Sequence, residues 1–326
     1  MRAIVCTGSG STDVLDWTEV ADPEPGPGEV LVSVCATAVN RADLLQRQGR
    51  YPPPPGASTI LGLECSGTVA ALGPGVHGHR EGDQVTALLA GGGYAERVCV
   101  PMGQLMSVPT NLDLVEAAAL PEAACTVWSN LAMVAGLQAG EFLLIHGGGS
   151  GIGTTAIQIA HQMGARVGVT AGSPEKLATC ARLGAEVLID YRTADFVAEI
   201  FRATDGAGAD VILDIMGAEY LARNCQALAR NGRLLVIGLQ GGTTAELSLG
   251  TLLAKNGSVH PTSLRGRPVE EKSVICRNVE QHVWPWVEAG VVAPVIGATL
   301  PLSHAADAHR MLEAGDVTGK IVLTVP

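Results

Sequence analysis

A cluster of glycines, HGGGSGIGT at 146–154, separates an apolar stretch from a stretch with helical periodicity. Backbone amides at a helix N-terminus bind phosphate, and glycines let the backbone approach it closely. This context is typical of a site for the diphosphate of a dinucleotide. The pattern G-x-G-x-x-G is not met strictly, because Ser150 stands at its middle position, and a plain tight turn is the alternative interpretation.

The segment after the next apolar stretch bears on the kind of dinucleotide. A site for NAD places an acidic residue there, about 20 residues beyond the loop, on the ribose 2′-hydroxyl. Here Ala171, Gly172 and Ser173 occupy that place, and Lys176 follows. A hydroxyl and a cation suit a 2′-phosphate, so the sequence predicts NADPH in preference to NADH. A solvated helix residue is the alternative for Lys176.

The elements around the loop alternate between strand and helix. Five segments have apolar strand patterns, and helical patterns separate them. The strand segments are FLLIHG, RVGVTAG, EVLIDY, ADVILDIM and GRLLVIGL. Four consecutive βα units with apolar strands predict a parallel, doubly wound sheet. The first 120 residues differ, since short apolar runs are broken there by proline and glycine, which predicts a β-rich unit. The expected fold class is therefore α/β with a second, β-rich domain.

The length of 326 residues allows two domains at about 150 residues each. We predict a β-rich domain from 1–120 and 290–326, and a dinucleotide-binding domain from 121–289. The last strands and helix are expected to return to the first domain.

Composition narrows the function classes. The 21 basic and 32 acidic residues give a net charge of −11, which disfavours a nucleic-acid partner. The uncharged windows 123–140 and 142–165 contain polar residues or glycine clusters, so no membrane span is expected. The N-terminus lacks the apolar stretch of a signal peptide. The eight cysteines show no C-x-x-C pair, which favours reduced thiols in a cytoplasm and no metal site.

Several motifs together resemble the medium-chain dehydrogenase/reductase superfamily. They are VNRADLLQRQGRYPPPPG at 39–56, GLECSGTVAALGPGV at 62–76, GDQV at 82–85, GGYAERVCVP at 92–101 and LPEAACTVWSNL at 120–131. The resemblance runs over the whole chain and implies a GroES-like catalytic domain and a Rossmann domain. Within the superfamily, the sequence is most similar to the zinc-independent NADPH:quinone oxidoreductases, the ζ-crystallin-like and stress-inducible group.

The resemblance also predicts that the site holds no metal. Zinc alcohol dehydrogenases of the superfamily carry a Cys and a His ligand where this chain has Asn40 and Leu63. Neither side chain serves as a ligand of catalytic zinc. Glu64 beside them is expected to be a buried acid hydrogen-bonded to backbone.

The same resemblance assigns site residues. Asn40 and Tyr51 are expected to line the acceptor pocket and to hydrogen-bond the acceptor oxygens, with Thr126 near the nicotinamide. Structural roles in a loop or in packing are the alternatives for Asn40 and Tyr51. The expected cofactor-binding residues are Ser150, Gly151, Ile152, Gly153, Ser173, Lys176, Tyr191, Ile237, Gly238, Leu239, Ser263, Leu264, Arg265 and Lys320.

The predicted function is hydride transfer from NADPH to a quinone or similar activated carbonyl, which is already electrophilic and needs no Lewis acid. Three alternatives remain open. They are a reductase of 2-enones or enoyl groups, a noncatalytic NADPH-binding protein and, least favoured, a zinc alcohol dehydrogenase with unusual ligands. The resemblance further implies a homodimer, for which the strand around Val259 and the segment near Trp284 are candidate contacts.

Overall fold

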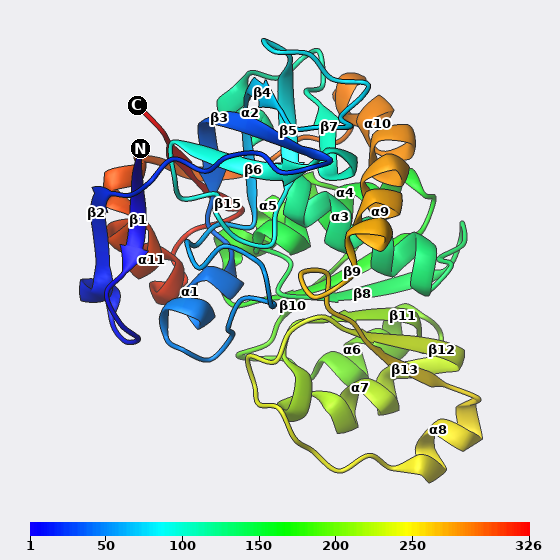
Figure 1. The fold of residues 1–326 in the computed structure, drawn as a ribbon. Helices are drawn as coiled ribbons and strands as arrows, with labels where there is room; N and C mark the ends of the chain where they lie inside the picture. Colours follow the sequence, from blue (N-terminus) through cyan, green and yellow to red (C-terminus); the bar gives the residue numbers. More distant parts are fainter. The chain divides into compact units, whose positions relative to one another are not determined.

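The computed structural model describes residues 1–326, which form two compact units. Unit 1 comprises residues 1–125 and 264–326, and unit 2 comprises residues 126–263. Figure 1 shows the helices and strands of both units. The helices of the chain are all too short or too polar to cross a membrane.

Unit 2 is built on a six-stranded parallel sheet with the strand order β10-β9-β8-β11-β12-β13. Counted from β8, this is the order 3-2-1-4-5-6 of dinucleotide-binding domains. The strands are β8 (Phe142–His146), β9 (Arg166–Ala171), β10 (Val187–Asp190), β11 (Ala209–Asp214), β12 (Leu228–Val236) and β13 (Ser258–Pro261). The predicted doubly wound sheet is therefore confirmed.

Short helices connect these strands. They are α4 (Gly151–Gln162), α5 (Pro174–Arg182), α6 (Phe196–Ala203), α7 (Leu221–Ala227) and α8 (Leu249–Lys255), with a π-helix η3 (Ser129–Val134) and a 3₁₀ turn η4 (Gly217–Glu219). β8 is buried along its whole length, because helices cover parallel sheets on both faces. Its Phe142 and Leu144 belong to a core cluster that includes Phe196 and Ile200 of α6. This core fixes the end of β8, which the glycine loop follows, and the end of β11, whose last residue is Asp214.

Unit 1 is built on a mixed sheet with the order β14-β15-β3-β4-β5-β7, in which β6 also pairs with β3. A separate hairpin joins β1 and β2. The strands are β1 (Arg2–Cys6), β2 (Leu15–Glu19), β3 (Glu29–Ala38), β4 (Glu64–Leu72), β5 (Gln84–Leu88), β6 (Arg97–Pro101), β7 (Leu105–Ser107), β14 (Ile296–Pro301) and β15 (Lys320–Thr324). Alternation along β3 buries Val30, Val32 and Val34 in one core cluster, as expected for a strand with a single core face.

The helices of unit 1 lie around this sheet. They are α1 (Arg41–Arg47), α2 (Leu114–Ala117), α3 (Pro121–Trp128, which continues into unit 2), α9 (Val269–His282), α10 (Trp284–Glu288) and α11 (Ala305–Ala314), with the 3₁₀ turns η1 (Thr12–Val14), η2 (Met102–Gln104) and η5 (Leu302–His304). Tyr94 and Leu61 pack in one cluster with Ala305 and Ala308 of α11, so the C-terminal helix covers one side of the sheet. The predicted return of residues 290–326 to the β-rich unit agrees with this arrangement.

The sequence predicted that the dinucleotide-binding domain ends at residue 289. In the structure unit 2 ends at residue 263, and residues 264–289 belong to unit 1. Ser107 at the end of β7 explains the difference. Its amide and hydroxyl donate to Glu280 of α9 at 2.8 and 2.6 Å, and its carbonyl accepts from Trp284 at 2.7 Å. Trp284 is 3% exposed, so its ring packs inside unit 1.

Candidate functional site

The glycine loop of unit 2 joins β8 to the N-terminus of α4. Ser150 is the N-cap of this helix, and its hydroxyl oxygen accepts from the amide of Gly153 at 2.9 Å and donates to the carbonyl of Gly147 at 2.7 Å. The first amides of a helix have no intrahelical acceptor. The Ser150 cap takes one of them, and the amides of Gly151 and Ile152 remain available to an anion.

Glycine stands at 153 because the start of α4 lies against the backbone of the glycine loop. A Cβ atom there would lie 2.6 Å from the Cα of Gly148, which is too close for any side chain. The serine in the middle of the pattern has a different function, since it closes the loop through its own hydroxyl. The loop thus presents backbone N–H groups at a helix N-terminus, the arrangement that binds a diphosphate.

Three of the expected cofactor residues lie together beyond the ends of β9 and β10. A Cβ at Gly172 would lie 2.5 Å from the Tyr191 hydroxyl oxygen, so that ring packs over Gly172. The aliphatic part of Lys176 covers Gly149 of the loop, 3.0 Å from where a Cβ of Gly149 would lie. Ser173 is the N-cap of α5 and accepts from the Lys176 amide at 3.3 Å. The structure thus brings a hydroxyl, a cation and a phenol to the strand ends next to the glycine loop.

The ends of β11 and β12 form the other side of this edge. Asp214 accepts from the amides of Met216 at 2.8 Å and Gly217 at 2.9 Å, and burial raises its pKa to about 6. Its carboxylate therefore holds a turn. Ile237 donates its amide to the Asp214 carbonyl at 2.8 Å, and Gly238 lies against Ile215, whereas Leu239 is 52% exposed.

Thr126 begins unit 2, and its carbonyl accepts from the Asn130 side chain at 2.8 Å. The Asn130 side-chain oxygen in turn accepts from Thr262 at 2.7 Å, next to Ser263. Unit 2 therefore contains eleven of the predicted cofactor residues together with Thr126. These residues are Ser150, Gly151, Ile152, Gly153, Ser173, Lys176, Tyr191, Ile237, Gly238, Leu239 and Ser263.

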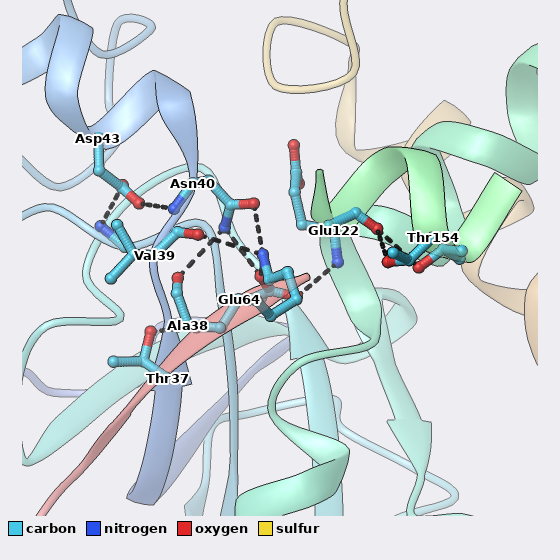
Figure 2. A network of polar contacts seen from close by, with 12 residues as sticks. Thr37, Ala38, Val39, Asn40, Asp43, Glu64, Glu122 and Thr154 are labelled. Atoms are coloured by element: carbon cyan, nitrogen blue, oxygen red, sulfur yellow. Dashed lines mark hydrogen bonds and ion pairs between the residues drawn. The ribbon is translucent and has the colours of Figure 1, made fainter. Parts of the chain in front are cut away.

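A polar cluster lies at the strand ends of unit 1 (Figure 2). The side-chain nitrogen of Asn40 donates to Oε1 of Glu64 at 2.8 Å and to the carbonyl of Ala38 at 3.2 Å. The Nζ of Lys320 donates to Oε1 of Glu64 at 2.6 Å, to Oδ1 of Asn40 at 2.7 Å and to the carbonyl of Val39 at 3.3 Å. Every hydrogen of the Asn40 side-chain amide and of the Lys320 ammonium group has an acceptor within the protein. Lys320 is therefore an internal ion-pair partner with no free donor for a cofactor.

Glu64 is fully buried, as expected from the sequence. Its Oε2 accepts from the backbone amide of Glu122 at 2.9 Å, which confirms the expected backbone contact. The ion pair with Lys320 was not foreseen from the sequence, because the two residues are 256 positions apart. Further hydrogen bonds to both groups offset part of the cost of burying such a pair.

Asp43 continues the cluster into α1. Its oxygens accept from the amides of Asn40 at 2.8 Å and Gly62 at 3.0 Å, and burial raises its pKa to about 6. Asn40 is the N-cap of α1, so this carboxyl group fixes the backbone from which the Asn40 side chain extends.

Arg265 holds the segment that carries Tyr51. Its guanidinium donates to Gln46 at 2.7 Å, to the carbonyl of Ala90 at 2.8 Å and to the carbonyl of Tyr51 at 3.5 Å. The same group lies 5.3 Å from the centre of the Tyr51 ring, within cation–π range. Arg265 and its neighbour Leu264 are 3% and 8% exposed and belong to unit 1, so the structure gives Arg265 a positioning contact with Tyr51.

Glu122 was missed by the sequence reasoning. It stands in the first turn of α3, in the otherwise apolar sequence LPEAAC, where an acid is ordinarily explained by the helix dipole. In the structure its Oε2 is buried and has no hydrogen-bond partner. The one signal in the sequence is that its neighbours Ala123, Ala124 and Cys125 are all apolar.

The residues at the strand ends of unit 1 do not fit a catalytic zinc ion. Leu63 is aliphatic and 1% exposed, and the Asn40 amide is committed to Glu64 and Lys320. A catalytic zinc needs three N, S or O ligands around one point. No group of three or more His, Cys, Asp or Glu side chains in residues 1–326 has that arrangement.

Comparison with known families gives two matches. Residues 151–278 match the family described as zinc-binding dehydrogenase, and residues 26–110 match the alcohol dehydrogenase GroES-like domain. Among curated proteins, a subunit of the phenolphthiocerol/phthiocerol polyketide synthase of Mycobacterium tuberculosis is 35% identical over 318 residues, which is 97% of this chain. The chain spans 14% of the length of that protein.

Solved structures resemble the chain over nearly its full length. An NAD-dependent alcohol dehydrogenase is 35% identical with a TM-score of 0.88, and each chain is covered completely. The Escherichia coli quinone oxidoreductase complexed with NADPH is 27% identical with a TM-score of 0.90, covering 99% of this chain and 100% of that one. The JamJ enoyl reductase is 27% identical with a TM-score of 0.89, covering 100% and 99%.

Proposed function

Because the chain belongs to the medium-chain dehydrogenase/reductase superfamily, we propose that it is a zinc-independent, NADPH-dependent reductase of quinones or similar activated carbonyls. The observation that carries the proposal is the cluster of Asn40, Glu64 and Lys320. Asn40 stands where zinc enzymes of the superfamily carry a Cys ligand, and its amide is hydrogen-bonded to the internal ion pair of Glu64 and Lys320. An acceptor reduced there must be electrophilic without help from a metal, and a quinone meets that condition.

The residues of unit 2 fit a dinucleotide phosphate. The amides of Gly151 and Ile152 would hold the diphosphate, and Ser173, Lys176 and Tyr191 would hold the adenosine phosphate. When bound, the nicotinamide supplies the hydride, since the cofactor carries this chemistry. The absence of an acid at positions 171–173 supports the proposed preference for NADPH, whereas one similar solved structure is an NAD-dependent enzyme.

The residues of unit 1 would bind and orient the acceptor. Tyr51 would donate its phenolic hydrogen to an acceptor oxygen, and Arg265 fixes the ring and the backbone of Tyr51 for that contact. Asn40 would line the pocket, with its amide held in one orientation by Glu64 and Lys320. A donor held in place before the reaction, here the Tyr51 hydroxyl, stabilises the negative charge that develops on the acceptor oxygen.

Reduction of a conjugated C=C bond in a 2-enone or enoyl group is the second candidate. The structural similarity to an enoyl reductase and the 35% identity to part of a polyketide synthase favour it. Both acceptors are electron-poor and place negative charge on a carbonyl oxygen after hydride transfer.

These functions are distinguished by the steady-state rate at which metal-free protein oxidises NADPH or NADH in the presence of each acceptor. The acceptors are 1,4-benzoquinone, a 1,2-quinone and a 2-enone. We expect quinone turnover with a lower KM for NADPH than for NADH. Turnover of the enone alone would replace the first candidate with the second. Cofactor binding without turnover of any acceptor would instead indicate a binding protein, and a requirement for added zinc would overturn the metal-free site.

A further inference from the structure

One carboxyl oxygen of Glu122 has no hydrogen-bond partner in the structure. The backbone amide of Glu122 donates to Glu64 at 2.9 Å, which attaches the first turn of α3 to the cluster of Asn40, Glu64 and Lys320. Its Oε2, in contrast, is buried without a hydrogen bond. Buried polar atoms nearly always have partners, so this unpaired carboxyl oxygen requires an explanation.

The charges that face this carboxyl group come from several elements. Glu64 of β4 and Asp43 of α1 disfavour its ionised form, and Lys320 of β15 and Arg265 favour it. Lys272 of α9 is also close enough to interact with it, and the thiol of Cys125 lies on its own helix. Burial is the largest effect, and together these contributions raise the pKa of Glu122 to about 8. The group is therefore a neutral acid at pH 7.

We propose that Glu122 donates the proton that completes reduction of the acceptor. This inference rests on the proposed function. Hydride transfer oxidises NADPH and leaves negative charge on an oxygen of the reduced quinone. The O–H bond of Glu122 then breaks as an O–H bond forms on that oxygen, directly or through one water. The Glu122 carboxylate regains a proton from solvent, so each cycle consumes one acceptor, one NADPH and one proton.

The pH dependence of kcat with NADPH and 1,4-benzoquinone tests this role. For the wild type, we expect kcat to fall as the pH rises above about 8, because the ionised carboxylate has no proton to give. Glu122→Gln is nearly isosteric and cannot donate that proton. We expect its kcat at pH 7 to fall by about 100-fold, with the alkaline decrease lost and the KM for NADPH unchanged. Glu122→Asp keeps the acid and should retain an alkaline decrease.

Infrared spectroscopy of the protein without substrate gives an independent readout. We expect a protonated carboxyl absorption that titrates near pH 8 in the wild type and is missing from Glu122→Gln. Glu246→Gln, at an exposed position, should keep both the band and the pH profile. Wild-type kcat and an unchanged alkaline decrease in Glu122→Gln would overturn the proposal while leaving the proposed function intact. Absence of turnover by the wild type itself would overturn both.

Discussion

The ammonium group of Lys320 lies 2.6 Å from Oε1 of Glu64, with the two side chains 5% and 0% exposed. The sheet explains how residues so distant in sequence meet. Glu64 begins β4 and Lys320 begins β15, and β3 pairs with both strands before ending at Ala38, two residues from Asn40. Three neighbouring strand ends thus bring an acid, a base and an amide to one point, in the interior of unit 1.

Replacing Lys320 tests the energetic value of this pair. Lys320→Met leaves the Glu64 carboxylate buried without its counter-charge, and removing one partner of a buried pair costs about 3–5 kcal/mol. We expect that loss in the free energy of unfolding, measured with urea. Adding Glu64→Gln should restore part of the stability, because the double variant buries no charge. Equal stability of Lys320→Met and the wild type would show that the pair contributes nothing.

Gly153 tests the glycine loop. Gly153→Ala places a Cβ 2.6 Å from the Cα of Gly148, so the loop and α4 must separate. We expect a lower melting temperature and about tenfold weaker NADPH binding by calorimetry, corresponding to about 1.4 kcal/mol. Gly250→Ala is the control, since nothing lies within 4 Å of a Cβ there and alanine favours the helix. Unchanged binding by Gly153→Ala would place the diphosphate elsewhere.

Lys176 tests the cofactor preference. Hydrogen bonds to charged groups contribute about 1.5–3 kcal/mol, so removing the ammonium group should weaken binding of a 2′-phosphate by about ten- to a hundredfold. We expect Lys176→Ala to raise the dissociation constant of NADPH by that factor and to leave that of NADH nearly unchanged. An equal effect on both cofactors would mean that Lys176 supports the loop through Gly149 and does not distinguish the phosphate.

The sequence predicted the parts of the fold that local patterns determine. Apolar strands alternating with helices led to the parallel sheet of unit 2, and the glycines after Phe142–His146 led to the loop at the N-terminus of α4. The place of α9 and α10 could not be predicted in this way, because it depends on contacts between Ser107 and residues about 175 positions later.

The site shows the same limit. Asn40 was identified by a motif, but the motif does not reveal that both of its amide hydrogens are already bonded. Lys320 was expected at a ligand, and in the structure it neutralises Glu64. Glu122 gave only a weak signal, because an acid in the first turn of a helix is common and its burial depends on residues far away in sequence.

The edge of the unit 2 sheet tests the expected homodimer. β13, which contains Val259, pairs only with β12, and Leu249 and Leu253 of the nearby α8 are 73% and 79% exposed. Unpaired edges and exposed apolar side chains favour association. We expect light scattering to give twice the 33.5 kDa chain mass, and Leu253→Lys to shift the protein toward monomer. Leu188→Lys on β10, at the opposite edge, should leave the dimer intact, and a monomeric wild type would contradict the expectation.

His146 predicts how stability depends on pH. The ring is 1% exposed, contacts Asn224 at 2.8 Å and Thr170 at 3.1 Å, and burial lowers its pKa from 6.5 to about 4. Between these two values the unfolded chain binds a proton that the folded chain does not, so acidification through this range favours unfolding. At pH 5, protonation of His146 in the unfolded chain lowers the free energy of unfolding by about 2 kcal/mol relative to neutral pH.

Comparing variants isolates this contribution, because Asp43 and Asp214, whose pKa values are raised to about 6, act in the opposite direction. His146→Gln should be less stable at pH 7.5, because it loses ring packing against Phe196 and Tyr220. The gap between wild type and variant should narrow by about 2 kcal/mol from pH 7.5 to pH 5, measured by urea unfolding. His77→Gln, at an exposed turn, should follow the wild type at every pH. A constant gap between wild type and His146→Gln would mean that folding does not lower the pKa of the ring.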